Sequence, residues 1–234
     1  YYEFEINAFG TEWDLLLPRP YRDGGLFINA WNIEDLKTAV KVWGTINDPS
    51  DFDEGWSLEI AFPWKVLQQG NNRRVKAIKG QIWRVNFSRV QWELDIVEGL
   101  YQKEQGKPEA NWVWSPQGIV NMHYPEKWGY VLFSETKVGE AIPHFEKPRT
   151  ETAKEILRSI YYREKEFFLA NGFYTMSMDS LGIDTPIIPD FIWPPQVVTS
   201  DFSFEASIQE VIDIEEDGSI NHWHITSDGR ITKR

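Results

Sequence analysis

The chain has 234 residues, of which 41% are hydrophobic and 15% aromatic, enough to build a folded core, so a globally disordered chain is excluded. Its 36 acidic and 24 basic residues give a net charge of -12, which would repel a phosphate backbone. No apolar run approaches the roughly 20 residues of a membrane-spanning helix. We therefore expect no nucleic-acid partner and no membrane span.

Tryptophan is distributed unevenly along the chain. Ten of the twelve tryptophans precede residue 137. A composition change this sharp predicts two units, with a boundary in residues 135–149, where glycine and proline interrupt both helical and strand patterns. The predicted domains are residues 1–136 and residues 150–234.

Alternating apolar and polar side chains predict strands in the first unit. In residues 2–7, for example, every second side chain is apolar, so one face of the segment suits burial. Short strands separated by turn-rich loops are typical of an antiparallel β-sandwich rather than of βαβ repeats. The predicted strands span residues 2–7, 36–43, 56–60, 83–87 and 128–132.

The second unit opens with a predicted helix. Thr152 and Glu155 have the spacing of a capping box at its start. Apolar residues then recur at helical spacing over 156–168, and Asn171-Gly172 is a typical helix stop.

Short strands follow the helix, after a proline-rich stretch. Asp217-Gly218 and Asp228-Gly229 are hairpin-turn signals, because glycine accepts the positive φ that such turns need. We therefore expect an α+β unit, one long helix packed on a small antiparallel sheet. Its predicted strands lie at residues 202–208, 211–214 and 220–225 and around Ile231.

The tryptophans of the first unit have two interpretations. An exposed indole can stack on a sugar ring, whereas a buried one fills a core. Trp56, Trp83 and Trp128 lie on the apolar faces of predicted strands, so we expect them in the core. Both roles stay open for three others, which lie among polar or loop residues: Trp31, Trp92 and Trp112.

Acidic pairs raise the possibility of glycoside hydrolysis, which needs two carboxyl groups beside one bond. Glu3 and Glu5 share one face of a predicted strand, and Glu59 is a further candidate. With 36 acidic residues such pairs arise often by chance, so a solvated strand face is the favoured interpretation.

Metal-site signals are weak. Cysteine is absent, which excludes disulfides and thiolate zinc sites. The oxygen-rich loop at residues 47–54 lacks the spacing of an EF-hand. His222 and His224 share one strand face and would supply half of a zinc site, with no evident third ligand.

Several segments of the first unit, taken in order, resemble the family 9 carbohydrate-binding module. The resemblance covers residues 1 to about 134. The matching segments are Phe4–Asn7, Leu36–Val40, Trp56–Trp64, Trp83–Arg89 and Asn111–Pro116, followed by Pro125–Gly129.

This resemblance implies a β-sandwich that binds carbohydrate without catalysis. The expected ligand is an oligo- or polysaccharide, bound at the ends of glucan or xylan chains, or a mono- or disaccharide. Such modules are often attached to secreted xylanases, and some bind structural Ca²⁺. It also implies a bacterial protein of polysaccharide utilisation that is secreted, periplasmic or on the cell surface. Expected hydrogen-bonding residues are Arg84, Asn86, Ser88, Asn121 and His123, with Trp31 or Trp112 as the stacking platform.

The sequence departs from the family pattern in three places. The second aromatic residue of the family's sugar site would fall near Asn121-Met122-His123, where no tryptophan stands. At the strand that matches Phe4–Asn7, Glu5 replaces an arginine that helps to hold the sugar. The family's first strands would precede Tyr2, so another chain or fragment is a candidate partner that supplies them. Because the sequence starts at Tyr1 without methionine or a leader-like segment, we expect a processed or shortened product.

The second unit is similar to the globular part of type IV pilin-like proteins, through Ala153–Tyr162 and Phe168–Tyr174. The long apolar assembly helix of a pilin has no counterpart here, so a packing module is expected rather than a filament. Two alternatives to glycan binding remain: a glycoside hydrolase of xylanase type, or part of one, and a structural or assembly protein that has lost sugar binding.

Overall fold

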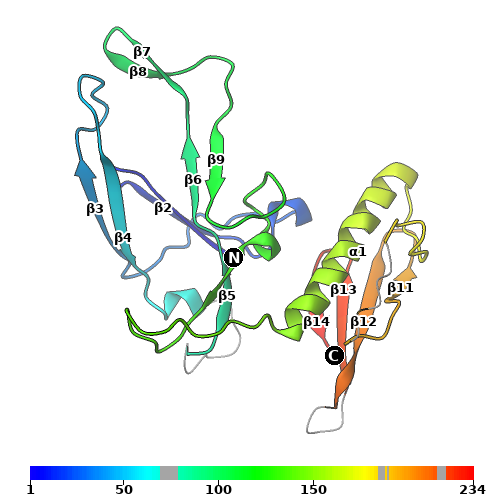
Figure 1. The fold of residues 1–234 in the computed structure, drawn as a ribbon. Helices are drawn as coiled ribbons and strands as arrows, with labels where there is room; N and C mark the ends of the chain where they lie inside the picture. Colours follow the sequence, from blue (N-terminus) through cyan, green and yellow to red (C-terminus); the bar gives the residue numbers. More distant parts are fainter. Residues whose placement is uncertain (69–78, 184–187, 189, 215–219) are drawn as a thin grey trace. The chain divides into compact units, whose positions relative to one another are not determined.

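The computed structural model describes residues 1–68, 79–183, 188, 190–214 and 220–234. The chain forms two compact units, Tyr1–Pro143 and His144–Arg234, called here the first and second units (Figure 1). Over these residues the fold is mainly β, with antiparallel sheets and one α-helix, as predicted. Within the described ranges, no helix has both the length and the apolar character that a bilayer span requires.

The first unit is built from antiparallel strand pairs. The pairs are β1–β2, β3–β4, β5–β10, β6–β9 and β7–β8. Short 3₁₀ turns lie at Tyr21–Asp23 (η1), Val66–Gln68 (η2) and Pro125–Lys127 (η3). The strands are β1 (Tyr2–Ile6), β2 (Glu12–Leu16), β3 (Lys37–Trp43), β4 (Gly55–Ala61), β5 (Ile82–Val85), β6 (Ser88–Gln91), β7 (Leu94–Val97), β8 (Leu100–Lys103), β9 (Ala110–Val113) and β10 (Gly129–Leu132).

The strands predicted from alternation are present, as β1, β3, β4, β5 and β10. Among the described residues, however, the pairs are separate two-stranded sheets that are not closed, so the predicted sandwich is not confirmed. Trp56 was expected in the core, but its side chain is 41% exposed. It lies on β4, which forms a two-stranded sheet with β3 in the described part of the chain.

The first unit has a small buried core. Four of its described hydrophobic side chains are buried: Leu15, Leu17, Ile33 and Val66. Around them, aromatic rings pack edge to face, as where Trp64 meets Trp83 with ring centroids 5.7 Å apart. Such pairs add about 1 kcal/mol each beyond the area they bury.

The second unit places one helix over a four-stranded sheet (Figure 1). Helix α1 spans Arg149–Asn171 and packs on the two central strands. The sheet is antiparallel in the order β11-β12-β13-β14. Its strands are β11 (Gln196–Thr199), β12 (Phe204–Ile214), β13 (Ile220–Thr226) and β14 (Ile231–Lys233).

The core of the second unit forms between two apolar faces, one on α1 and one on the sheet. On α1, Ala153, Leu157 and Ile160 recur at helical spacing and are fully buried. On the sheet, alternate residues such as Ala206 and Ile225 point to the helix and are fully buried as well. Burying a side chain of leucine or isoleucine size contributes about 1.5–3 kcal/mol.

The start of α1 corrects the predicted cap. The helix begins at Arg149 with Pro148 at the N-cap position, so Thr152 lies inside the first turn and does not cap it. Proline is tolerated at the start of a helix, because a backbone N–H at that end has no partner within the helix. The predicted stop is confirmed: Gly172 has φ 80° and its N–H donates to the Phe168 carbonyl at 2.8 Å.

The strands of the second unit differ from the prediction in two respects. Residues 202–208 and 211–214 were expected as two strands, but a single strand, β12, runs from Phe204 to Ile214, with a register shift between Gln209 and Ile214. Strand β11 was not predicted, because it follows directly on prolines. The Asp228-Gly229 turn is confirmed, whereas the Asp217-Gly218 turn lies outside the described residues.

Candidate functional site

Polar and aromatic side chains from three segments meet beside β1 in the first unit. The hydroxyl of Tyr1 lies 3.0 Å from Nδ1 of His123, and Oε2 of Glu3 lies 3.6 Å from the same nitrogen. The ring of Tyr21 meets the His123 imidazole edge-on, with centroids 4.9 Å apart. We call these four residues, Tyr1, Glu3, Tyr21 and His123, the His123 cluster.

The strand alternation of β1 positions the acidic member of this cluster. Glu3 pairs with Leu15 of β2, whose side chain is 1% exposed, so the carboxyl group lies beside the small core. Glu5, two residues along, pairs with Trp13 and is exposed. The two glutamates share one face of β1, so their different burial comes from their different neighbours along the strand and not from the alternation itself.

The imidazole is held by the loop that precedes η3. The side-chain oxygen of Asn121 accepts a hydrogen bond from the His123 backbone N–H at 2.8 Å. Trp128 closes the loop, because its Nε1–H donates to the Met122 carbonyl at 2.7 Å. The Tyr1 ring packs edge-on against Trp128, with centroids 5.1 Å apart. Local turn bonds and ring packing thus orient the histidine.

An ion pair links the two 3₁₀ turns around the cluster. A guanidinium nitrogen of Arg22 in η1 lies 2.9 Å from a carboxylate oxygen of Glu126 in η3, and both side chains are largely buried. The Arg22 guanidinium also lies over the Tyr124 ring, 4.5 Å from its centroid. This pair fixes η1, and with it Tyr21, against the loop that carries His123.

Burial changes the acid–base properties of the cluster. Desolvation raises the pKa of Glu3; the nearby Glu5 raises it further, while His123 acts in the opposite direction. Desolvation also raises the pKa of the Tyr1 and Tyr21 hydroxyls. Glu3 therefore keeps its proton to a higher pH than an exposed glutamate, and its carboxyl group can then donate as well as accept a hydrogen bond.

The cluster is open to solvent. The side chain of His123 is 35% exposed, that of Glu3 is 20% exposed, and Tyr21 is 40% exposed. The partly exposed side chains thus bring a carboxyl group, an imidazole and an aromatic ring to one place, with Oε2 of Glu3 on the buried side.

Two of the predicted hydrogen-bonding residues are used inside the first unit. Arg84 of β5 donates to the Trp128 carbonyl at 2.9 Å and to the Tyr130 hydroxyl, and its guanidinium lies 3.8 Å from the Tyr130 ring centroid. Asn86 accepts a hydrogen bond from Gln117 Nε2 at 3.2 Å. Both side chains stabilise the region around β5 and β10.

The other predicted site residues lie outside the His123 cluster. Trp31 stacks on Tyr2, with ring centroids 5.0 Å apart and 25° between the planes. Ser88 lies exposed on β6, and Trp112 lies on the paired strand β9, where it is 63% exposed. Of the seven predicted residues, the structure brings Asn121 and His123 into the His123 cluster region and leaves the rest at other places.

Tyr21 was missed by the sequence analysis. It lies in η1, directly after Pro20, in a segment without apolar alternation. Its contact with His123 spans about a hundred residues of sequence and depends on the Arg22–Glu126 pair. The sequence signal that pointed to the cluster was Glu3, because its position in the strand places it on the same face as Tyr1.

The oxygen-rich loop at residues 47–54 uses its carboxylates for its own turns. Asp53 accepts from the Thr45 backbone N–H at 2.7 Å, and Asp51 accepts from the Thr45 hydroxyl at 2.8 Å. Across the part of the chain that the structure describes, no group of three or more histidine, aspartate or glutamate side chains is placed to hold a metal ion.

Comparison with known proteins identifies no matching family model, no matching curated protein and no matching solved structure. The two resemblances seen in the sequence therefore stay predictions, and the function must be argued from the chain's own residues.

Proposed function

We propose that the first unit binds a saccharide without catalysis, at the His123 cluster. The observation that carries the proposal is the convergence of Glu3, His123 and Tyr21, all partly exposed, at one place. Sugar recognition needs donors and acceptors for hydroxyl groups and an apolar ring face for C–H groups. The His123 cluster offers all three.

Each member has a defined part in this proposal. The Glu3 carboxyl group and the His123 imidazole exchange hydrogen bonds with neighbouring sugar hydroxyls. The exposed Tyr21 ring covers an apolar patch of the sugar. The resemblance to the family 9 carbohydrate-binding module supports the ligand class, glucan or xylan oligosaccharides, the sandwich architecture, and a secreted, periplasmic or cell-surface setting in bacterial polysaccharide utilisation.

Calorimetric titration of the chain against mono- and oligosaccharides of glucose and xylose tests the proposal. Saturable heat is expected with at least one of them. Glu3→Gln and Tyr21→Ala should each weaken that binding about tenfold or more, since each removes a ligand contact. Trp112→Ala is the matched control, because Trp112 is an exposed aromatic residue outside the cluster, and it should leave the affinity unchanged.

Two outcomes would reject this proposal. The first is no heat with any saccharide, which would favour the structural or assembly role instead. The second is binding that Trp112→Ala removes and Tyr21→Ala does not, which would move the site to the β6–β9 pair.

A second candidate function is glycoside hydrolysis, and one observation favours it. Desolvation raises the pKa of Glu3 and the neighbouring Glu5 raises it further, as expected of a general acid beside a second carboxylate. Release of reducing sugar that Glu3→Gln abolishes would support this function. Saccharide binding with no such release, for glucans and xylans alike, would reject it.

A further inference from the structure

Two histidines project from the outer face of the sheet in the second unit. On β13 the residues that face the helix, such as Trp223 and Ile225, are buried, so the alternate residues His222 and His224 lie on the opposite face. Their ring centroids are 6.3 Å apart and their planes differ by 25°. Two imidazoles are therefore held side by side.

A carboxylate fixes the orientation of one ring. Nδ1 of His224 donates to Oε1 of Glu205, on the neighbouring strand β12, at 2.8 Å. This bond places the proton of a neutral imidazole on Nδ1 and leaves the lone pair on Nε2. A carboxylate that binds the second nitrogen in this way is the usual support of a metal-ligating histidine. The other Glu205 oxygen lies 3.4 Å from the exposed Arg234.

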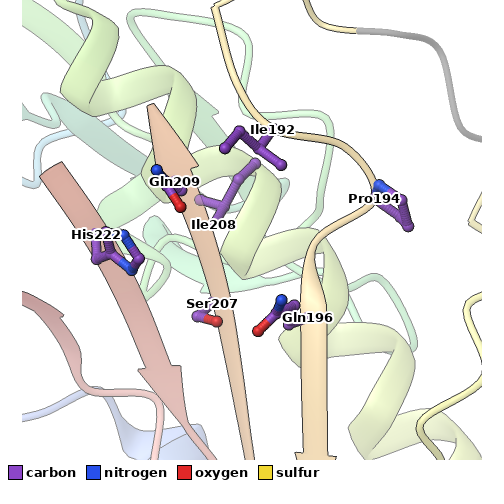
Figure 2. A pocket seen from close by; sticks show the side chains of 7 residues that line it. All are labelled: Ile192, Pro194, Gln196, Ser207, Ile208, Gln209 and His222. Atoms are coloured by element: carbon purple, nitrogen blue, oxygen red, sulfur yellow. The ribbon is translucent and has the colours of Figure 1, made fainter. Parts of the chain in front are cut away.

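The second ring borders a small surface pocket that offers oxygen atoms. His222 lines this pocket together with Gln196, Ser207 and Gln209 (Figure 2). In the β12–β13 register, Gln209 lies opposite His222 and Ser207 lies opposite His224. Among the described residues, no hydrogen bond restrains the His222 ring, so it can turn about its side-chain bonds toward a ligand shared with His224.

We propose that this face of the second unit binds one divalent transition-metal ion of the imidazole-seeking class, represented by Zn²⁺ and Cu²⁺. Nε2 of His224 and one ring nitrogen of His222 bind the ion, and Glu205 is a positioning residue. In the described chain no further histidine or carboxylate is placed as a third metal ligand, so water and the pocket oxygens fill the remaining coordination positions. Such an incomplete protein shell is typical of an exchangeable or reactive site rather than a closed structural one.

The site is independent of the proposed saccharide site, because its ligands all belong to the second unit. The choice of ion follows from ligand chemistry: imidazole suits Zn²⁺ and Cu²⁺, whereas Mg²⁺ and Ca²⁺ prefer all-oxygen shells. Failure of one proposal therefore leaves the other untouched.

Calorimetric titration of the full chain, without a histidine tag, tests the metal proposal. One equivalent of Zn²⁺ or Cu²⁺ should bind, and Mg²⁺ and Ca²⁺ should not. His222→Asn and His224→Asn should each remove most of the affinity, and Glu205→Gln should lower it about tenfold. His144→Asn, an exposed histidine in the same unit, should leave it unchanged.

Imidazole NMR signals of the unsubstituted protein give a second measurement that does not depend on how the variants fold. The chain has four histidines, so the signals can be assigned individually. Added Zn²⁺ should shift the signals of His222 and His224 and leave that of His144 in place. No binding, binding that survives both His222→Asn and His224→Asn, or zinc-induced shifts at His123 or His144 alone would overturn the proposal.

Discussion

The two units use the same strand alternation with different results. In the second unit the apolar face of each central strand meets the apolar stripe of α1, and one continuous core forms around fully buried residues such as Leu157 and Ile225. In the first unit, strands pair two by two, and many of the large apolar side chains stay exposed, for example Trp112 and Phe87. Alternation therefore specifies a strand, but a core requires a second layer to face it.

This difference also separates the two proposed sites. The His123 cluster is assembled from loops and short turns around β1, held by an ion pair and ring contacts. The histidine pair of the second unit lies on a strand that a full core supports from behind. The backbone that carries the second site is therefore the more rigid of the two.

The largest expected effect of substitution lies in the core of the second unit. Leu157→Ala removes a fully buried side chain and should lower the free energy of unfolding of this unit by about 2–5 kcal/mol. Leu169→Ala on the same helix is the matched control, since Leu169 is 86% exposed and its truncation should cost little. Denaturant unfolding followed by circular dichroism measures both. Equal effects of the two would contradict the described core.

A buried polar network gives the next effect. The Glu210 carboxylate accepts from Trp223 Nε1 at 2.9 Å and from Asn221 Nδ2 at 3.1 Å, and the residue is 3% exposed. Glu210→Ala leaves both donors unsatisfied and should cost about 3 kcal/mol, whereas Glu210→Gln keeps an acceptor and should cost less. If both variants unfold at the same denaturant concentration, the carboxylate oxygens are not the acceptors described.

The pH dependence of stability follows from Glu164, which lies fully buried on α1. Desolvation raises its pKa above the ordinary 4.5, against one hydrogen bond from the Thr175 backbone N–H. Because the folded state then holds the proton more tightly than the unfolded state, the contribution of this group to stability is greatest at low pH. It falls as the pH rises through the folded pKa.

Glu164→Gln removes this titration. Thermal unfolding between pH 4 and pH 8 should therefore show a smaller loss of stability on the alkaline side for the variant than for the parent chain. Identical pH profiles of the two proteins would show that Glu164 is ionised or solvated in the fold.

The smallest effect is expected in the first unit. Trp112→Ala truncates a side chain that is 63% exposed, so the free energy of unfolding should change by about 0.5 kcal/mol or less. Trp223→Ala, at 8% exposure in the second unit, should cost about 3–5 kcal/mol. Intrinsic tryptophan fluorescence and calorimetric unfolding compare them. A large cost at Trp112 would mean that the first unit has a core that the described residues do not show.

Much of the secondary structure was predictable, because local patterns determine it. The strand at residues 2–7 and the helix stop at Gly172 follow from period-2 alternation and from glycine at positive φ. Strand β7 was missed, since its residues are all exposed and carry no alternation of burial. The N-cap was misplaced because Thr152-x-x-Glu155 is a common pattern that also occurs inside a helix.

The candidate site was predictable only in part, since it depends on long-range pairing. His123 was identified from the resemblance, and Glu3 from strand position. Their meeting with Tyr21 depends on the Arg22–Glu126 ion pair, whose partners are far apart in sequence. Conversely, Arg84 has a polar position on its strand, yet its guanidinium is occupied by Trp128 and Tyr130.

The central claim, saccharide binding at the His123 cluster, is tested most directly by NMR titration of the chain with xylose and glucose oligosaccharides. The imidazole signal of His123 and the ring signals of Tyr21 should shift together and saturate with at least one oligosaccharide, while the signal of His144 stays in place. Unmoved His123 and Tyr21 signals at saturating concentrations of every oligosaccharide would contradict the account.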